Sequence, residues 1–149
     1  MRARAVLGCF MGCERGSVMV ETALGLSILI TMTAGIMEFC MMGYTYSVYA
    51  DAARAGLRYA TTHGSDSTLC SGPGCTDSTG ANVSSTVTTY VSNFATLASN
   101  VKVTVTYLDS SAVPPSRVQV SVSYTYKPML GLRGLNKTFT ATTAGIIGY

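Results

Sequence analysis

The fold of this chain is decided by residues 16–60, which read GSVMVETALGLSILITMTAGIMEFCMMGYTYSVYADAARAGLRYA. This stretch contains no Lys or Arg before Arg54, and Glu21 and Glu38 are the only acids in its apolar first part. The apolar part approaches the ~20 residues that a bilayer-spanning helix requires. The pattern therefore predicts a membrane-spanning helix over residues 18–42.

The helix is expected to continue past the bilayer as an amphipathic helix. Apolar side chains recur there at three- and four-residue steps, while the charged side chains fall on another face. The apolar positions are Tyr46, Ala50, Ala53, Leu57 and Ala60. Because no Pro occurs before Gly64, we predict one helix over residues 17–62, with its amphipathic extension at 43–62.

The charge of the first sixteen residues sets the expected orientation. Residues 1–16 carry three Arg and one Glu. Positive charge beside a membrane span is typical of the cytoplasmic side. The N-terminus is therefore predicted to be cytoplasmic, and everything after Phe39 is predicted to be outside the cytoplasm.

Two of the five cysteines lie in a predicted surface loop, residues 63–81. Cys70 and Cys75 enclose turn residues, Ser-Gly-Pro-Gly, that allow the chain to fold back. An extracytoplasmic compartment permits oxidation, so a disulfide at the tip of the loop is expected, with two free thiols as the alternative. A metal pair lacks further ligands nearby.

The remainder, residues 82–149, is expected to form an α+β domain outside the cytoplasm. Helical spacing of Val, Tyr, Phe and Leu predicts a second helix over residues 82–99. Alternating apolar residues predict antiparallel strands over 101–107 and 118–126, and a third strand over 138–147. The second helix is expected to cover this small sheet.

The inventory of reactive side chains argues against an enzyme. The chain has one His and no Glu after Glu38, and its net charge is only +3. No phosphate-binding loop, metal cluster or basic patch is present in the sequence. We therefore expect no catalytic residues, no cofactor, no metal and no nucleic-acid partner, and interpret His63 as a solvated residue at a helix end.

The two acids of the predicted span need an explanation. An ionised carboxylate in hydrocarbon costs several kcal/mol unless it is compensated. Glu21 must therefore have a partner or reach the cytoplasmic interface. Glu38 lies 17 positions further on, roughly 25 Å along a helix, so it is expected near the outer interface, either reaching water or pairing with another subunit. Tyr44, Tyr46 and Tyr49 are expected to form an interfacial aromatic belt there.

The linked motifs of this stretch support a family resemblance. A basic leader, Gly16-Ser17 and an acid at Glu21 resemble the processing site of type IV pilins and pseudopilins. The wider set resembles the N-terminal signature of TadE-like and TadG-like proteins, which are minor pseudopilins of the tight-adherence pilus system. This set comprises Gly16-Ser17, Val20-Glu21, Ala23-Leu24, the segment Gly35 to Phe39 and the segment Asp51 to Ala60.

The resemblance implies a pilin-like fold and a role in pilus assembly. Residues 1–16 would be a leader that a prepilin peptidase removes after Gly16. The freed amine of Ser17 would then neutralise Glu21, on its own chain or a neighbouring one, and so set the register of assembly. Partners implied are the major and other minor pilins and the inner-membrane assembly platform.

The implied location is the bacterial inner membrane, with a single span and a periplasmic C-terminal domain. From there the subunit would assist a tight-adherence pilus or secretion fibre, or enter it. The sequence leaves one alternative open. The chain would then be a membrane-anchored extracytoplasmic binding or adhesion module that does not polymerise.

Overall fold

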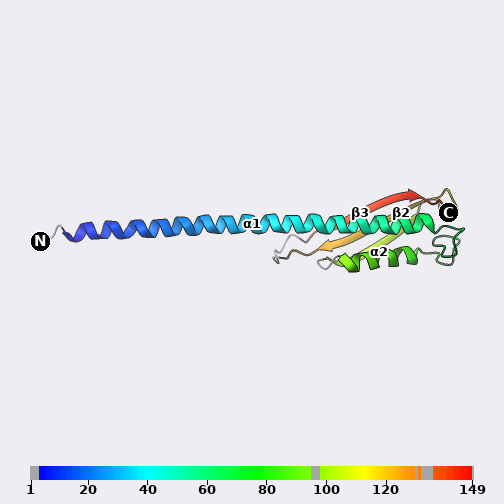
Figure 1. Ribbon diagram of the computed structural model, residues 1–149, viewed down its shortest axis with the longest axis horizontal. Coiled ribbons are helices and arrows are strands. Elements are labelled where there is room, and N and C mark those ends of the chain that lie inside the picture. The colour runs from blue at the N-terminus through cyan, green and yellow to red at the C-terminus, as the bar shows by residue number, and fades with distance from the viewer. Residues whose placement is uncertain (1–3, 95–97, 130, 132–135, 149) are drawn as a thin grey trace. The chain divides into compact units, whose positions relative to one another are not determined.

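The computed structural model describes residues 4–94, 98–129, 131 and 136–148. The chain divides into two compact units, Met1–Phe39 and Cys40–Tyr149. The element order is helix, helix and three strands; Figure 1 shows them and labels α1, α2, β2 and β3. This confirms the predicted α+β fold, in which a long apolar N-terminal helix precedes a second helix and an antiparallel sheet.

The first helix, α1, comprises Arg4–Thr62 and contributes to both units. It ends where the sequence predicts, but it begins at Arg4 rather than at residue 17. Residues 4–16 lack Pro, and about half of them are good helix formers such as Ala, Leu, Met, Glu and Arg, although three are Gly. Residues 4–16 are more polar than the membrane-spanning part of α1, but they too can form a helix.

The second unit contains a three-stranded sheet in which each strand pairs with the next along the chain. Its strands are β1 (Ala98–Tyr107), β2 (Arg117–Tyr126) and β3 (Thr138–Ile146), in the order β1-β2-β3. Both pairings are antiparallel; β2 and β3 pair without interruption, whereas the β1–β2 register shifts between Ser99 and Lys102. The alternating apolar and polar residues of these segments explain the strands.

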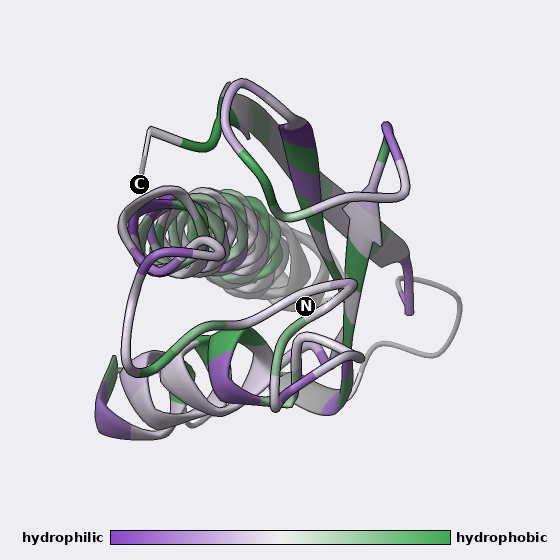
Figure 2. Ribbon diagram, turned by 90° about the vertical axis from the view of Figure 1, so that its right-hand side faces the viewer, coloured by the Kyte–Doolittle hydropathy of each residue, from purple (hydrophilic) through white to green (hydrophobic). Residues whose placement is uncertain are grey.

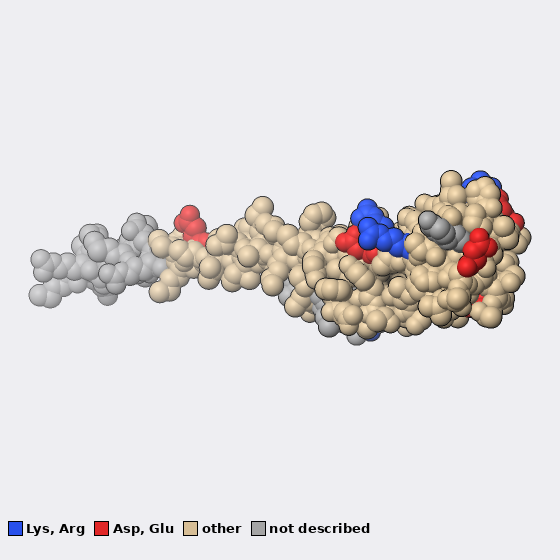
Figure 3. Space-filling view, turned by 45° about the vertical axis from the view of Figure 1, so that its right-hand side comes forward, with Lys and Arg blue, Asp and Glu red and all other residues tan. Residues whose placement is uncertain are grey.

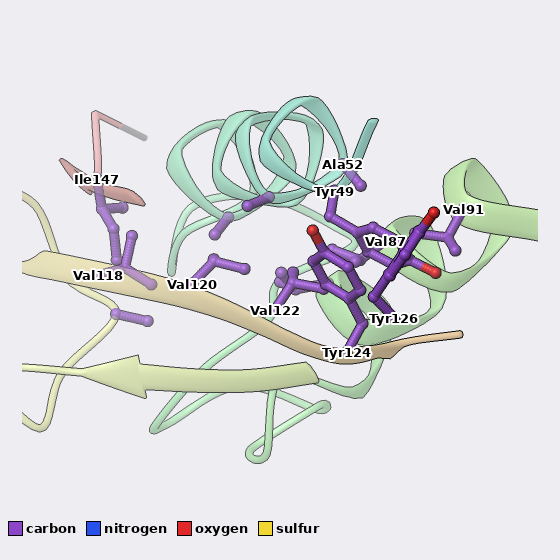
Figure 4. Close-up of a cluster of buried hydrophobic side chains, with 14 residues drawn as sticks. Tyr49, Ala52, Val87, Val91, Val118, Val120, Val122, Tyr124, Tyr126 and Ile147 are labelled. Atoms are coloured by element: carbon purple, nitrogen blue, oxygen red, sulfur yellow. The ribbon is translucent and has the colours of Figure 1, made fainter. Parts of the chain in front are cut away.

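One face of the sheet carries the core of this unit. Along β2, side chains alternate between buried and partly exposed, and the buried set is Val118, Val120, Val122, Tyr124 and Tyr126. The part of α1 after residue 40 and the helix α2 (Ala81–Phe94) both pack on this face, as Figures 2 and 4 show. The second unit is therefore a two-layer α/β sandwich with one hydrophobic core.

The helices contribute a narrow stripe of small and apolar residues to the core. From α1 it includes Val48, Tyr49, Ala52, Ala53, Gly56 and Ala60; from α2 it includes Val83, Val87 and Val91. Small side chains on α1 let the helix approach the sheet and α2 closely. An added Cβ on Gly56, for instance, would clash with the Val87 side chain.

The predicted apolar face of residues 43–62 was only partly right. Ala53 and Ala60 are buried, but Tyr46 is exposed, and Tyr49, expected in an aromatic belt at the membrane, is fully buried in the core. Its ring stacks on Tyr124 of β2. The pattern alone could not fix the face, because apolar residues surround the helix at this point and the sheet selects among them.

The second helix was predicted too long. It ends at Phe94 rather than continuing to residue 99, and β1 starts at Ala98, three residues before the predicted strand. The predicted contact of Leu97 lies outside the described residues. Ser, Thr and Val, which dominate this region, have weak helix preference, and Val and Thr favour strands, so the boundary is poorly defined by sequence.

Candidate membrane and assembly segment

The helix from Val18 to Phe39 exposes a nearly continuous apolar surface. Twelve large apolar side chains in this part are 58–74% exposed: Val18, Met19, Val20, Leu24, Leu26, Ile28, Leu29, Ile30, Met32, Ile36, Met37 and Phe39. Figure 3 shows this part of the surface with very few charged side chains. Surface of this kind and extent is unfavourable in water and marks contact with a membrane or with other proteins.

By length and composition, one helix among the described residues is able to cross a membrane. It is the Gly16–Thr62 part of α1. Only 6% of its most apolar window is buried within the protein, which distinguishes it from the core helix of a soluble protein. This supports single-pass membrane anchoring through α1.

The hydroxyl groups of this segment are adapted to an apolar surrounding. Thr22 donates to the carbonyl oxygen of Val18, Ser27 to that of Leu24, Thr31 to that of Ser27 and Thr33 to that of Leu29, at 2.8–2.9 Å. Each hydroxyl therefore finds its acceptor within the helix. Such bonds let Ser and Thr lie in hydrocarbon without an unsatisfied donor.

Glu21 lies on the exposed surface of this segment, four residues after Ser17. Within the described residues it forms no hydrogen bond and no salt bridge. Gly16, five residues before Glu21, is also exposed, and an added Cβ on it would meet nothing within 4 Å. The structure thus presents both the expected cleavage position and the expected assembly acid on an open helix.

Glu38 is placed differently from Glu21. It is only 8% exposed, although most of its neighbours along the apolar segment are exposed. This burial does not decide between its two expected roles, which are reaching water at the outer membrane interface and pairing with another subunit. Its role as an interface residue stays a prediction.

A compact clasp holds the loop between α1 and α2. Cys70 and Cys75, the pair for which the sequence suggests a disulfide, are joined by one. The disulfide does not lie at the tip of a surface loop, because Cys70 is buried and Cys75 packs against the core. The hydroxyl of Tyr107 donates to the carbonyl oxygen of Ser71 at 2.9 Å and ties the loop to β1.

Asp77 completes this clasp and starts α2. Its carboxylate accepts hydrogen bonds from the backbone N–H groups of Ala81 (2.9 Å) and Asn82 (2.8 Å) and from the Ser71 hydroxyl (2.7 Å). Burial raises the pKa of Asp77, but these bonds, together with one from Thr79, outweigh it and lower the pKa to about 2. This cap was not predicted from the sequence, although Asp77-Ser-Thr-Gly80 before a helical pattern is a recognisable start signal.

Four of the remaining charged residues form two surface pairs. Asp51 and Arg54 form a salt bridge of 2.8 Å on α1, and Asp109 and Arg117 form another of 2.8 Å beside β2. His63 stacks on Tyr59, with ring centroids 4.1 Å apart, and its Nδ1 lies 3.0 Å from the Tyr59 carbonyl oxygen at the end of α1. No group of three metal-binding side chains occurs among the described residues.

Among the described residues, one exposed apolar N-terminal helix followed by a small α+β unit suggests a single-pass, helix-anchored protein. Residues 16–58 match the sequence model of a family described as TadE-like protein. The match identifies this segment as TadE-like, is consistent with a TadE-like protein, and associates the chain with the tight-adherence pilus system. Searches of curated proteins and of solved structures returned no match.

Proposed function

We propose that this chain is a minor pseudopilin that assists assembly of a tight-adherence pilus or secretion fibre. In this proposal a prepilin peptidase removes residues 1–16, and the mature chain begins at Ser17. The chain acts as a structural subunit and performs no enzymatic reaction. Its partners are the major and other minor pilins, the assembly platform and the bilayer.

The exposed position of Glu21 on the apolar helix is the observation that carries the proposal. A carboxylate in hydrocarbon requires a compensating charge. Cleavage after Gly16 would create an amine on Ser17, and four residues of helix separate the two groups by about 6 Å, roughly one turn. The same amine on a neighbouring subunit would serve equally well and would fix the axial offset between the two helices.

The apolar surface around Glu21 supports the same function. A subunit that leaves the bilayer must exchange lipid for other apolar helices. Small residues such as Gly25, Ser27 and Gly35 permit close helix contact, and added Cβ atoms on Gly25 and Gly35 would meet nothing within 4 Å. Because its Ser and Thr hydroxyls already donate to carbonyl oxygens of the same helix, this segment can lie in lipid or against other apolar helices.

Substitution of Glu21 tests the proposal. Glu21→Gln keeps the shape of the side chain and removes its charge, and Ser27→Ala serves as a control on the same exposed segment. We expect both variants to be recovered with membranes, but only the Ser27 variant to restore sheared surface fibres to a strain that lacks the chain. Normal piliation by Glu21→Gln would contradict the register role.

The location of the wild-type chain separates this function from its alternative. A minor pseudopilin is expected in the sheared fibre fraction or, if it only assists assembly, to be required for that fraction to form. An anchored binding module would remain with membranes, and its deletion would leave fibres intact. Deletion followed by shearing therefore decides between the two.

A further inference from the structure

Among the described residues, no strand pairs with the outer edge of β3. Tyr126 of β2 donates its N–H to the carbonyl oxygen of Lys137, and the β2–β3 register continues from that pair without interruption. Because hydrogen-bonded pairs alternate along an antiparallel ladder, the odd-numbered residues of β3 bond to β2. The N–H and C=O groups that point away from the sheet belong to Thr138, Thr140, Thr142, Ala144 and Ile146.

On the outer edge of β1 the odd-numbered residues, rather than the even-numbered ones, have backbone groups that point away from the sheet. Leu108 donates its N–H to the carbonyl oxygen of Arg117, so the even-numbered residues of β1 bond to β2. Backbone groups of Val103, Val105 and Tyr107 consequently point away from the sheet. The side chains of these three residues face the core, whereas the outward-bonding residues of β3 have side chains on the polar face.

The β3 edge lacks the features that normally protect a sheet edge. Thr138–Ile146 contains no charged residue and no Pro, and its pairing with β2 contains no bulge. Its side chains are held in line by hydroxyl pairs across the strands, including Ser121–Thr142 and Ser123–Thr140, each at 3.1 Å. Edges of this kind are ready to accept another strand.

We propose that β3 of one copy pairs in parallel with the β1 edge of a second copy. In a parallel ladder, a residue that bonds to the partner lies opposite a residue that bonds away from it. The opposite parity of the two edges meets this requirement and keeps polar face beside polar face. With Thr142 opposite Thr104, Thr142 bonds to Val103 and Val105 of the second copy, and Ala141 lies beside Val103 on the core side.

Strand direction favours this arrangement over a pair of β3 edges. Since both edge strands are antiparallel to β2, they run in the same direction. A parallel β3–β1 contact therefore lets α1 enter the second unit from the same end in both copies. Antiparallel β3–β3 pairing would place the two entry points at opposite ends of the combined sheet, so the parallel contact is the one that suits two chains anchored in one membrane. This choice of strand direction rests on the proposed membrane anchoring, whereas the odd–even hydrogen-bond pattern of the two edges does not.

Cysteine cross-linking of the full-length chain in membranes tests the contact. Cys9, Cys13 and Cys40 are first replaced by Ser, and Thr142→Cys and Thr104→Cys are then placed on separate, differently tagged chains. Directly opposite residues of neighbouring strands lie about 4.8 Å apart, within disulfide reach. Within one chain β2 separates these positions by roughly 9–10 Å, beyond that reach, so a cross-link must join two chains.

After mild oxidation we expect a covalent dimer only when both cysteine chains are present. Mixing Thr142→Cys with Ser121→Cys, a substitution on the central strand, should give none. A dimer from Thr142→Cys alone would show β3–β3 pairing and overturn the proposal, as would the absence of a dimer from chains recovered with membranes. Recovery with membranes and fibre formation are scored separately, so failure of the contact is distinguishable from failure of the pseudopilin function.

Discussion

The ring of Tyr49 on α1 stacks on the ring of Tyr124 on β2, with centroids 3.8 Å apart and planes inclined by 12°. Both side chains are buried, and their hydroxyls have no hydrogen-bond partner in the part of the chain that the structure describes. Burial first, and the nearby Tyr49 and Tyr46 in addition, raise the pKa of Tyr124 to about 12. The stack joins the helix to the sheet by packing rather than by polar bonds.

Two substitutions of Tyr49 should therefore separate the contribution of its ring to stability from that of its hydroxyl. Tyr49→Phe removes an unsatisfied buried hydroxyl and should change the free energy of unfolding by less than about 1 kcal/mol. Tyr49→Ala removes the stacked ring and should destabilise by about 3–5 kcal/mol. Denaturant unfolding of the detergent-solubilised chain measures both, and a Phe variant as unstable as the Ala variant would contradict this description of the core.

Two glycines of α1 should respond oppositely to alanine. Gly56→Ala drives a methyl group into Val87 and should destabilise the second unit by about 1–3 kcal/mol. Gly43→Ala meets nothing within 4 Å and should instead stabilise the helix by up to about 1 kcal/mol. Thermal unfolding of the two variants provides the comparison. Equal effects would mean that α1 does not pack on α2 as described.

Asp77 should make the second unit sensitive to acid. The pKa of this carboxyl is about 2 in the folded chain, against 3.8 for its ordinary value, so its contribution to stability is present above pH 4 and is lost as the pH falls toward 2. Asp77→Asn keeps a capping oxygen but removes the negative charge beside the start of α2, so it should lower stability at pH 7 by about 0.3–1 kcal/mol and remove this acid-dependent part.

The control for Asp77 is Asp66→Asn, which removes a carboxylate from the same loop without touching an N–H group of α2. Asp109, whose pKa is also lowered to about 2 by its hydrogen bonds to Arg117, titrates in the same range. The difference between wild type and Asp77→Asn therefore isolates Asp77. Parallel acid-unfolding curves for wild type and Asp77→Asn would refute the capping role.

The disulfide should stabilise the loop at the end of α1. Replacing Cys75 by Ser opens a short loop of the kind for which chain-entropy arguments give about 2 kcal/mol. The clasp also includes the Tyr107–Ser71 hydrogen bond, so α2 should become easier to cleave by protease near its start. Limited proteolysis of oxidised wild type and of Cys75→Ser compares the two; identical cleavage would mean that the disulfide does not restrain the loop.

Much of the fold could be predicted from sequence because its signals are local. A long apolar run gives α1, and strict alternation gives β2, whose buried residues Val118 to Tyr126 follow that alternation. The face of α1 that meets the sheet could not be predicted, because Tyr46, Val48 and Tyr49 are all apolar. Only the position of Tyr124, 75 residues after Tyr49, selects among them.

The candidate site was predictable to a different degree. Gly16, Ser17 and Glu21 were singled out by their resemblance to a processing site; the structure places them on an exposed apolar helix, and their roles stay predictions. The burial of Glu38 was not predicted, because the sequence gives its position along the helix but not the residues that pack around it. The clasp around Asp77 was missed because its partners, Ser71 and α2, come together only through the turn of the loop.

The most direct test of the pseudopilin account is the N-terminal residue of the mature chain. Intact-mass and N-terminal peptide analysis of the chain from membranes that contain the prepilin peptidase should find Ser17 first, with a free amine, and should find Met1 only when the peptidase is absent. A chain that retains residues 1–16 in both strains would contradict the account, because Glu21 would then have no newly formed amine to meet.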